Sequence, residues 1–198
     1  MKTKIAAILV VSACVTPWAT PVVSAEDVLH ESVYQVGTLK PRDSVLKVRE
    51  GDMAPEFTLR AVSGGTVSLK DYLGKKNIVI SFVPAAWTPV CSDQWPGYNI
   101  AREEFEGNDA MLIGISVDNT PTQFAWTRAM GALWFPVLSD FWPHGKVADT
   151  YGVLRTDGTA ERAIFIVDKK GRIRYIDVHD INSRPPLDGI IDELKKLK

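Results

Sequence analysis

The chain has 198 residues, of which 45% are hydrophobic and 24% are charged, as in a globular protein with a substantial core. Its 23 basic and 24 acidic residues leave a formal net charge of −1, so its electrostatics do not favour a nucleic-acid partner. The length suits one ordinary domain with an extension.

The N-terminus has the pattern of a targeting segment. Lys2 and Lys4 precede an apolar run at residues 5–11, and small residues follow at 23–25. This order is typical of a secretory signal peptide that is cleaved after the small residues. The apolar run is too short, and too soon interrupted by proline, for a membrane-spanning helix. We therefore predict a signal peptide over residues 1–25 and export to a bacterial periplasm.

A second interpretation of this segment stays open. Residues 11–14, Val-Ser-Ala-Cys, resemble a bacterial lipobox, in which Cys14 carries lipid as the first residue of the mature protein. Attachment to a membrane is expected only in that case. The chain has two cysteines, Cys14 and Cys91, so under either interpretation the mature protein keeps one free thiol. A lone thiol in an oxidising compartment forms no internal disulfide and is a candidate for reactivity.

Strands and helices are predicted to alternate along the rest of the chain. Residues 26–50 have few apolar residues and no clear period, and we expect a surface arm there, followed by one domain over residues 51–198. The patterns predict a β-hairpin over 57–69, a helical turn over 70–76, strands over 77–83, 111–117, 135–140, 163–168 and 173–178, and helices over 92–106, 120–130 (with Thr120 as N-cap), 146–151 and 187–197. This order predicts a mixed α/β sheet.

The most informative motif lies between the strand over 77–83 and the helix over 92–106. Cys91 falls in the first turn of that helix, where free backbone N–H groups and the helix dipole stabilise an anion. Such a thiol is biased toward the thiolate, which is the nucleophilic form. Thr88 lies one helical turn before the sulfur, and Pro84 gives the loop a rigid ring without an N–H donor. A buried structural cysteine is the competing interpretation, and the neighbouring threonine and proline argue against it.

The spacing of Pro84, Thr88 and Cys91 resembles the peroxiredoxin active-site motif, Pro-x-x-x-Thr-x-x-Cys. The segment 161–168 is similar to the family's Arg-(Ala/Gly)-Thr-Phe-Ile-(Val/Ile)-Asp segment, with Ile164 in place of the usual threonine. Recognisable similarity extends over residues 51–178, which is most of the mature chain. The resemblance implies a thioredoxin-like fold in its peroxiredoxin elaboration, with a mixed central sheet flanked by helices.

The same resemblance implies a thiol-dependent peroxidase that reduces hydrogen peroxide and organic hydroperoxides. The Cys91 thiolate is then the nucleophile, and Pro84 shields it from water. Thr88 and Arg162 are expected to hold the peroxide, because a guanidinium stays charged and bonds both sulfur and oxygen. No cofactor and no metal are expected, and homodimers are common in the family.

Two positions of the predicted helix depart from the family pattern. Some relatives carry a resolving cysteine five residues after the reactive one, where this chain has Pro96, and no cysteine follows Cys91. The sulfenic acid at Cys91 is therefore expected to be resolved by an external thiol or a thioredoxin-like reductant. Gln94 stands where many relatives have Glu, so a carboxylate that orients the site is missing.

Residues 134–153 resemble the one-cysteine enzymes of the alkyl hydroperoxide reductase E group. Within them, Phe141 and Trp142 are expected to form an apolar collar near the site together with Trp87, which would suit organic hydroperoxides. Packing alone is an equally good account of these aromatic residues. His144, in a Pro-His-Gly turn, is interpreted as a loop residue.

Three other functions occur on folds of this kind. A thiol–disulfide oxidoreductase uses Cys-x-x-Cys, but Gln94 stands three residues after Cys91, so this chain would need a partner's cysteine. A copper-binding protein needs paired cysteines and a distal histidine. An exported, non-catalytic binding module would be expected to have lost the motif, whereas Pro84, Thr88 and Arg162 are all present.

Overall fold

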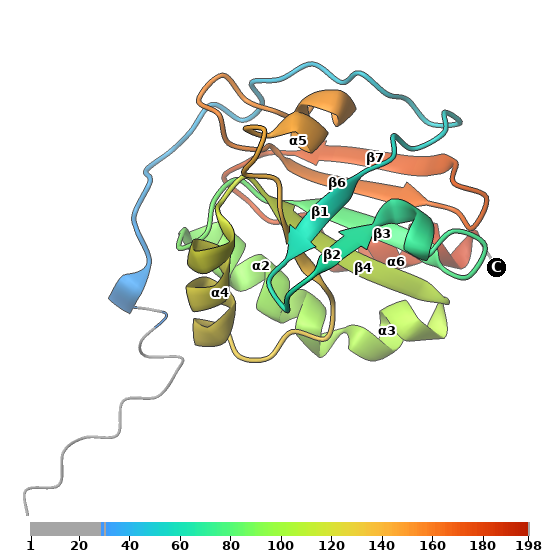
Figure 1. Cartoon of the computed structure of the whole chain (residues 1–198), viewed down its shortest axis with the longest axis horizontal. Helices are drawn as coiled ribbons and strands as arrows, with labels where there is room; N and C mark the ends of the chain where they lie inside the picture. The colour runs from blue at the N-terminus through green and yellow to red at the C-terminus, as the bar shows by residue number, and fades with distance from the viewer. Residues whose placement is uncertain (1–28, 30, 198) are drawn as a thin grey trace, which may run out of the picture.

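The computed structural model describes residue 29 and residues 31–197, which build a mixed seven-stranded sheet with helices on both faces (Figure 1). The strand order is β2-β1-β5-β4-β3-β6-β7. The strands are β1 Thr58–Ala61, β2 Thr66–Ser68, β3 Asn77–Phe82, β4 Ala110–Ser116, β5 Val137–Ser139, β6 Arg162–Val167 and β7 Ile173–His179. This architecture confirms the predicted thioredoxin-like α/β class.

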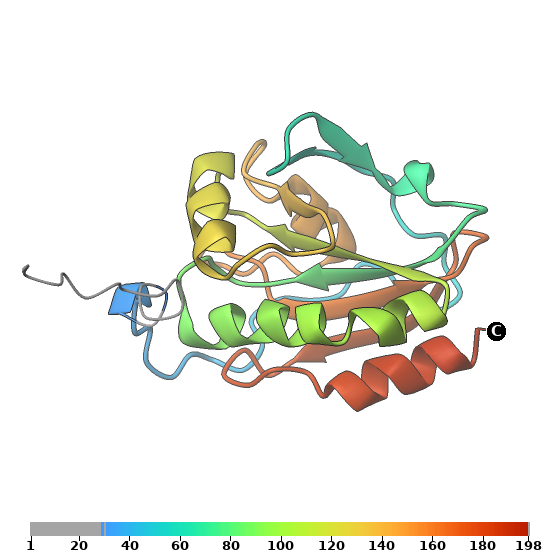
Figure 2. The ribbon, with the colours of Figure 1, turned by 90° about the horizontal axis from the view of Figure 1, so that it is seen from below.

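The sheet separates two apolar cores. The helices are α2 Pro89–Ile100, α3 Arg102–Gly107, α4 Thr120–Ala129, α5 Lys146–Tyr151, α6 Leu187–Lys195 and the short 3-10 helix η1 Leu69–Asp71. Successive residues of a strand face opposite sides, so Ile80 and Phe82 of β3 enter one core and Val79 enters the other. Helices α2, α3 and α6 lie on the Val79 face (Figure 2), and α4 packs there through Trp126. Helix α5 and the β1–β2 hairpin cover the opposite face.

The central strand β3 brings distant parts of the chain to one edge of the sheet. It runs parallel to β4 and antiparallel to β6, and Phe82 at its end pairs with Ala163 near the start of β6. The loop after β3 and the first residue of β6 therefore meet at the same edge. Cys91 follows that loop, and Arg162 is that first residue.

The helix predicted over 92–106 is two helices. Helix α2 begins at Pro89, because Thr88 is its extended N-cap and proline suits a first helical position that needs no N–H donor. It ends at Ala101, whose ψ of 17° leaves the helical region. The carbonyl of Ala101 then accepts hydrogen bonds from the N–H groups of Glu104 and Phe105 and starts α3.

The N-cap predicted for the next helix is also wrong by one residue. Asn119, not Thr120, caps α4, and its side-chain oxygen accepts a hydrogen bond from the N–H of Thr122 at 3.0 Å. Thr120 already belongs to the helix. Asparagine is as strong an N-cap as any residue, and its amide oxygen reaches the N–H three residues ahead.

Residues 31–50 cross the outside of the molecule past α5 before they enter β1 (Figure 1). The N–H of Lys47 donates to the carbonyl of Tyr151 at 3.3 Å. At Gly152, with φ of +75°, a Cβ would lie 2.2 Å from the Lys47 nitrogen, so only glycine allows this approach. None of the helices in the described residues has the length and apolarity needed to cross a membrane. The predicted signal peptide over 1–25 and Cys14 lie outside the described residues.

Candidate active site

Cys91 is the third residue of α2 and lies in its first turn, as predicted. Its side chain has no exposed surface, and it carries no disulfide. Arg162 Nη2 lies 3.5 Å from Cys91 Sγ. The sulfur therefore faces two sources of positive potential, the N-terminus of α2 and a guanidinium.

Arg162 is almost fully buried, with 2% of its surface exposed. A buried charge needs hydrogen-bond partners to offset lost hydration. Its Nε and Nη2 donate to the carbonyl of Ile181 at 3.2 and 3.1 Å, and its Nη1 donates to Gln94 Oε1 at 2.5 Å. These bonds aim the remaining N–H of Nη2 at Cys91. No local pattern pointed to Ile181, because it is apolar and contacts Arg162 through its backbone carbonyl.

Gln94 supplies the side-chain acceptor for Arg162 Nη1. It lies one turn after Cys91 on α2, and its Nε2 donates to Ser81 Oγ at 3.2 Å and to Tyr98 Oη at 3.1 Å. These two bonds fix the orientation of the amide, so its oxygen points at Arg162. Burial raises the pKa of Tyr98 far above its ordinary value, so this hydroxyl stays neutral. The guanidinium is thus oriented without an added negative charge.

The loop before α2 holds the other two motif residues. Thr88 Oγ1 donates to the carbonyl of Ala85 at 2.8 Å, which closes the loop on itself. Pro84 and Thr88 line the same pocket as Arg162. The structure therefore brings all four predicted site residues to one place.

Asp118 also supports this loop, and the sequence reasoning missed it. Its Oδ2 accepts hydrogen bonds from the N–H of Ala86 at 2.8 Å and from Ser116 Oγ at 2.7 Å. Asp118 comes just after β4, next to β3 in the sheet. The sequence did contain a signal for Asp118, because it is a polar residue just after a buried central strand. The parallel strands β3 and β4 end at the same edge of the sheet, so residues that follow them lie close together.

The pocket beside Arg162 encloses about 540 Å³. The predicted aromatic collar is wrong for this pocket, because none of Phe141, Trp142 and Trp87 lines it. Phe141 and Trp142 are 46% and 71% exposed and pack edge-on against His144 in their own turn. Residues 34–39 form the wall instead. The aromatic residues and residues 34–39 lie far apart in the sequence, so a local pattern could not show which of the two sets lines the pocket.

Ile164, where the sequence departs from the family segment, is a core residue. It has no exposed surface and belongs to the same apolar cluster as Cys91. Its register partners are Ser81 on β3 and Asp177 on β7. No cluster of three or more His, Cys, Asp or Glu side chains suited to a metal ion is found among the residues with a described position.

Residues 50–176 match the model of the AhpC/TSA family. The chain belongs to this family and is an enzyme of the thiol-dependent peroxidase class.

Individual relatives agree with this membership. The chain is 40% identical over 129 residues to alkyl hydroperoxide reductase E of Mycobacterium bovis, covering 65% of this chain and 84% of that protein. It is 32% identical over 160 residues to the chloroplastic 2-cysteine peroxiredoxin of Chattonella marina var. antiqua, covering 77% and 82%. Among solved structures, Mycobacterium tuberculosis AhpC superimposes with a TM-score of 0.70 at 27% identity, covering 76% of this chain and 93% of that one.

Proposed function

We propose that this enzyme reduces hydrogen peroxide and organic hydroperoxides at Cys91 through a cysteine sulfenic acid. The observation that carries the proposal is the 3.5 Å contact between Arg162 Nη2 and Cys91 Sγ in the first turn of α2. One guanidinium in this position stabilises the thiolate before the reaction and the charge on the peroxide oxygens during it. Preorganised charge of this kind is a large source of catalysis, because it needs no reorientation when the reaction occurs.

The chemical step is a displacement at oxygen. The Cys91 thiolate attacks the terminal oxygen of the hydroperoxide, an S–O bond forms and the O–O bond breaks. The sulfur is oxidised by two electrons to sulfenic acid, and the peroxide is reduced to an alkoxide, or hydroxide, that takes a proton from water. Arg162 stabilises the charge on the departing oxygen. Thr88 and Pro84 shape the space in which the peroxide lies.

We propose that an external thiol resolves the sulfenic acid, so that the enzyme works with one cysteine. The sequence has Pro96 at the position of one resolving cysteine and no cysteine after Cys91. The incoming thiol forms a disulfide with Cys91 and releases water. A second thiol then reduces that disulfide and restores Cys91. A small thiol or a thioredoxin-like protein both meet this chemical requirement.

We also propose that the protein is exported through the signal peptide over residues 1–25. The support is the order of lysines, apolar run and small residues in the sequence. Mass spectrometry of the protein from its native cells distinguishes the two processing routes. An N-terminus at Glu26 supports simple cleavage, an N-terminus at a lipidated Cys14 supports a lipoprotein, and an intact Met1 contradicts export.

The test of the function follows tryptophan fluorescence when the reduced protein is mixed with stoichiometric hydrogen peroxide. Trp87 and Trp95 lie near Cys91 in the sequence and can report its oxidation. We expect a rapid change and one added oxygen at Cys91 by mass spectrometry, both absent in Cys91→Ser. Arg162→Ala should slow the reaction about 10²–10³-fold, as loss of one preorganised donor does. Oxidation no faster than that of a free thiol would favour the non-catalytic binding module.

A further inference from the structure

One wall of the active-site pocket comes from outside the domain core. Residues 34–39, here named the strap, line the pocket together with Pro84, Thr88 and Arg162. The family match begins only at residue 50, so the strap lies outside the part of the chain that the family model describes. The lining of the pocket is therefore divided between the part of the chain that the family model matches and a segment that precedes it.

The strap is tied down at both ends. At its start, the N–H of Tyr34 donates to the carbonyl of Trp87, in the loop that carries the motif, at 2.7 Å. At its end, Asn182 bonds both backbone groups of Leu39, accepting from its N–H at 2.8 Å and donating to its carbonyl at 2.9 Å. Asn182 follows Ile181, whose carbonyl holds Arg162. The strap thus spans the pocket between the two segments that build the reactive centre.

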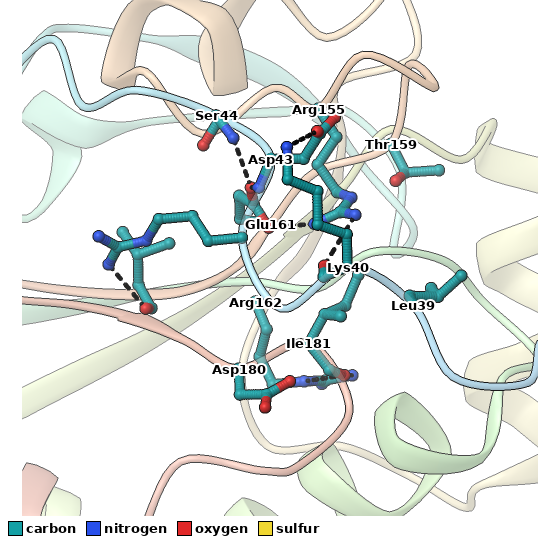
Figure 3. A network of polar contacts seen from close by, with 12 residues as sticks. Leu39, Lys40, Asp43, Ser44, Arg155, Thr159, Glu161, Arg162, Asp180 and Ile181 are labelled. Carbon is teal, nitrogen blue, oxygen red and sulfur yellow. Dashed lines mark hydrogen bonds and ion pairs between the residues drawn. The ribbon is translucent and has the colours of Figure 1, made fainter.

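A buried ion pair holds the chain directly after the strap (Figure 3). Glu161, with no exposed surface, accepts hydrogen bonds from the N–H groups of Asp43 and Ser44 at 2.6 and 2.8 Å. Its other oxygen bonds Arg155 at 2.6 Å, and Arg155 donates in turn to the carbonyl of Lys40 at 3.1 Å. Glu161 immediately precedes Arg162, so the strap and the catalytic guanidinium share one anchor.

The pocket is larger than hydrogen peroxide requires, and its lining combines apolar side chains with polar ones such as Asp157, Arg162 and Asn182. It encloses about 540 Å³, within the range of about 300–1,000 Å³ found for organic ligands, whereas a water-sized molecule occupies about 30 Å³. The apolar part of the lining includes Val36 and Leu39 of the strap together with Val90 and Ile181. Such a lining favours an uncharged carbon group, while the reacting oxygens lie toward Arg162.

We propose that the strap is the specificity wall of this peroxidase, and that Leu39 and Val36 bind the carbon part of an apolar organic hydroperoxide. This inference rests on the proposed function, because it concerns the substrate of the same cysteine. The strap contributes binding energy to bulky hydroperoxides and none to hydrogen peroxide, which is too small to reach it. Leu39 and Val36 determine specificity and take no part in the chemical step.

The test compares the oxidation rate of Cys91 by hydrogen peroxide and by cumene hydroperoxide, each measured in stopped flow over a range of concentrations. Leu39→Ala removes apolar contact and should lower the rate constant for cumene hydroperoxide about tenfold, as loss of one or two methylene contacts does. Its rate constant with hydrogen peroxide should stay within about twofold of the wild type. Val36→Thr, which preserves volume and adds a hydroxyl, should act in the same direction.

Val45→Ala is the matched control, because Val45 belongs to the same arm, is 83% exposed and does not line the pocket. It should leave both rate constants unchanged. An unchanged ratio of the two rate constants in both strap variants would overturn the proposal. An equal fall with both peroxides would also overturn it, because the strap would then only support the fold. A wild-type protein that reacts with neither peroxide faster than a free thiol would overturn the proposed function as well.

Discussion

At the scale of single residues, the site depends on how the N–H groups of the Arg162 guanidinium are distributed among their hydrogen-bond partners. Arg162 gives two N–H bonds to the Ile181 carbonyl and one to Gln94, and a fourth N–H, on Nη2, is directed at Cys91. The planar fork of arginine permits this division, whereas the ammonium of lysine has no fixed directions. Gln94 keeps the orientation of the arginine and adds no negative charge beside the thiolate.

The role of Gln94 can be tested by removing or changing its acceptor. Gln94→Leu leaves a buried N–H of Arg162 without a partner, at a cost of ~1–3 kcal/mol in the free energy of unfolding. The peroxidase rate constant should fall about tenfold, equivalent to ~1.4 kcal/mol in the barrier, because Arg162 loses its orientation. Gln94→Glu keeps an oxygen acceptor at this position and should keep the rate constant within a few-fold of the wild type. If Gln94→Leu retains the full rate, the amide does not position Arg162.

At the scale of elements, the placement of Cys91 depends on how closely α2 packs against β4. Gly114 on β4 lies under the ring of Trp95, and a Cβ at this position would be 2.7 Å from Trp95 Cζ2. Trp95 is fully buried and stacks with Trp126 of α4, with ring centroids 4.9 Å apart. Trp95 lies one turn after Cys91, so glycine at 114 sets the distance between the reactive helix and the sheet.

Gly114→Ala should therefore displace α2. The added methyl meets a rigid ring in a filled core, and overpacking of this kind costs about 1–3 kcal/mol in the free energy of unfolding. Urea denaturation measures that loss, and stopped flow should show a slower oxidation of Cys91. Gly107→Ala is the control, because a Cβ there meets no atom within 4 Å, and it should lower neither stability nor rate. Full stability of Gly114→Ala would show that the helix can move away without penalty.

At the scale of the whole molecule, ion pairs connect the strands at the edge of the sheet opposite the active site. Asp109, just before β4, forms ion pairs with Lys169 in the β6–β7 turn and with Lys76 just before β3. Hydrogen bonds from Lys169 and Lys76 lower the pKa of Asp109 to about 2. An acid with a lowered pKa in the folded state stabilises the fold above its unfolded pKa of about 3.9. That contribution is lost as the pH falls toward 2.

Asp109→Asn should remove this part of the acid sensitivity. Asparagine suits the positive φ of 53° at this position, so the backbone is not strained by the change. Urea unfolding at pH values from 7 to 2 should show a smaller loss of stability between about pH 4 and pH 2 for the variant than for the wild type. The effect is modest because the three side chains are about half exposed. Parallel curves for the two proteins would contradict the assignment.

The patterns in the sequence predicted a mixed α/β sheet, the hairpin, the strands, most of the helices and the position of Cys91 in the first turn of a helix. These predictions rest on periodic burial and turn residues, which are local features, whereas the thioredoxin-like fold was implied by the resemblance that Pro84, Thr88 and Cys91 carry. Arg162 was identified through a family resemblance. The N-cap of α4 was predicted one residue too late, and the break at Ala101, which divides one predicted helix into two, was missed. Helix ends are hard to place because neighbouring residues can end a helix almost equally well.

The surroundings of these residues depend on contacts between segments that are far apart in the sequence. Arg162 and Cys91 are 71 positions apart, and the antiparallel pairing of β3 with β6 brings them together. The same folding joins Glu161 to Ser44 across 117 positions and places the strap, rather than the predicted aromatic collar, along the pocket. Contacts of this kind depend on the path of the whole chain, because a backbone carbonyl or an apolar wall has no signature in the local sequence. The reactive group is thus encoded locally, and the shape of its pocket is encoded by the fold.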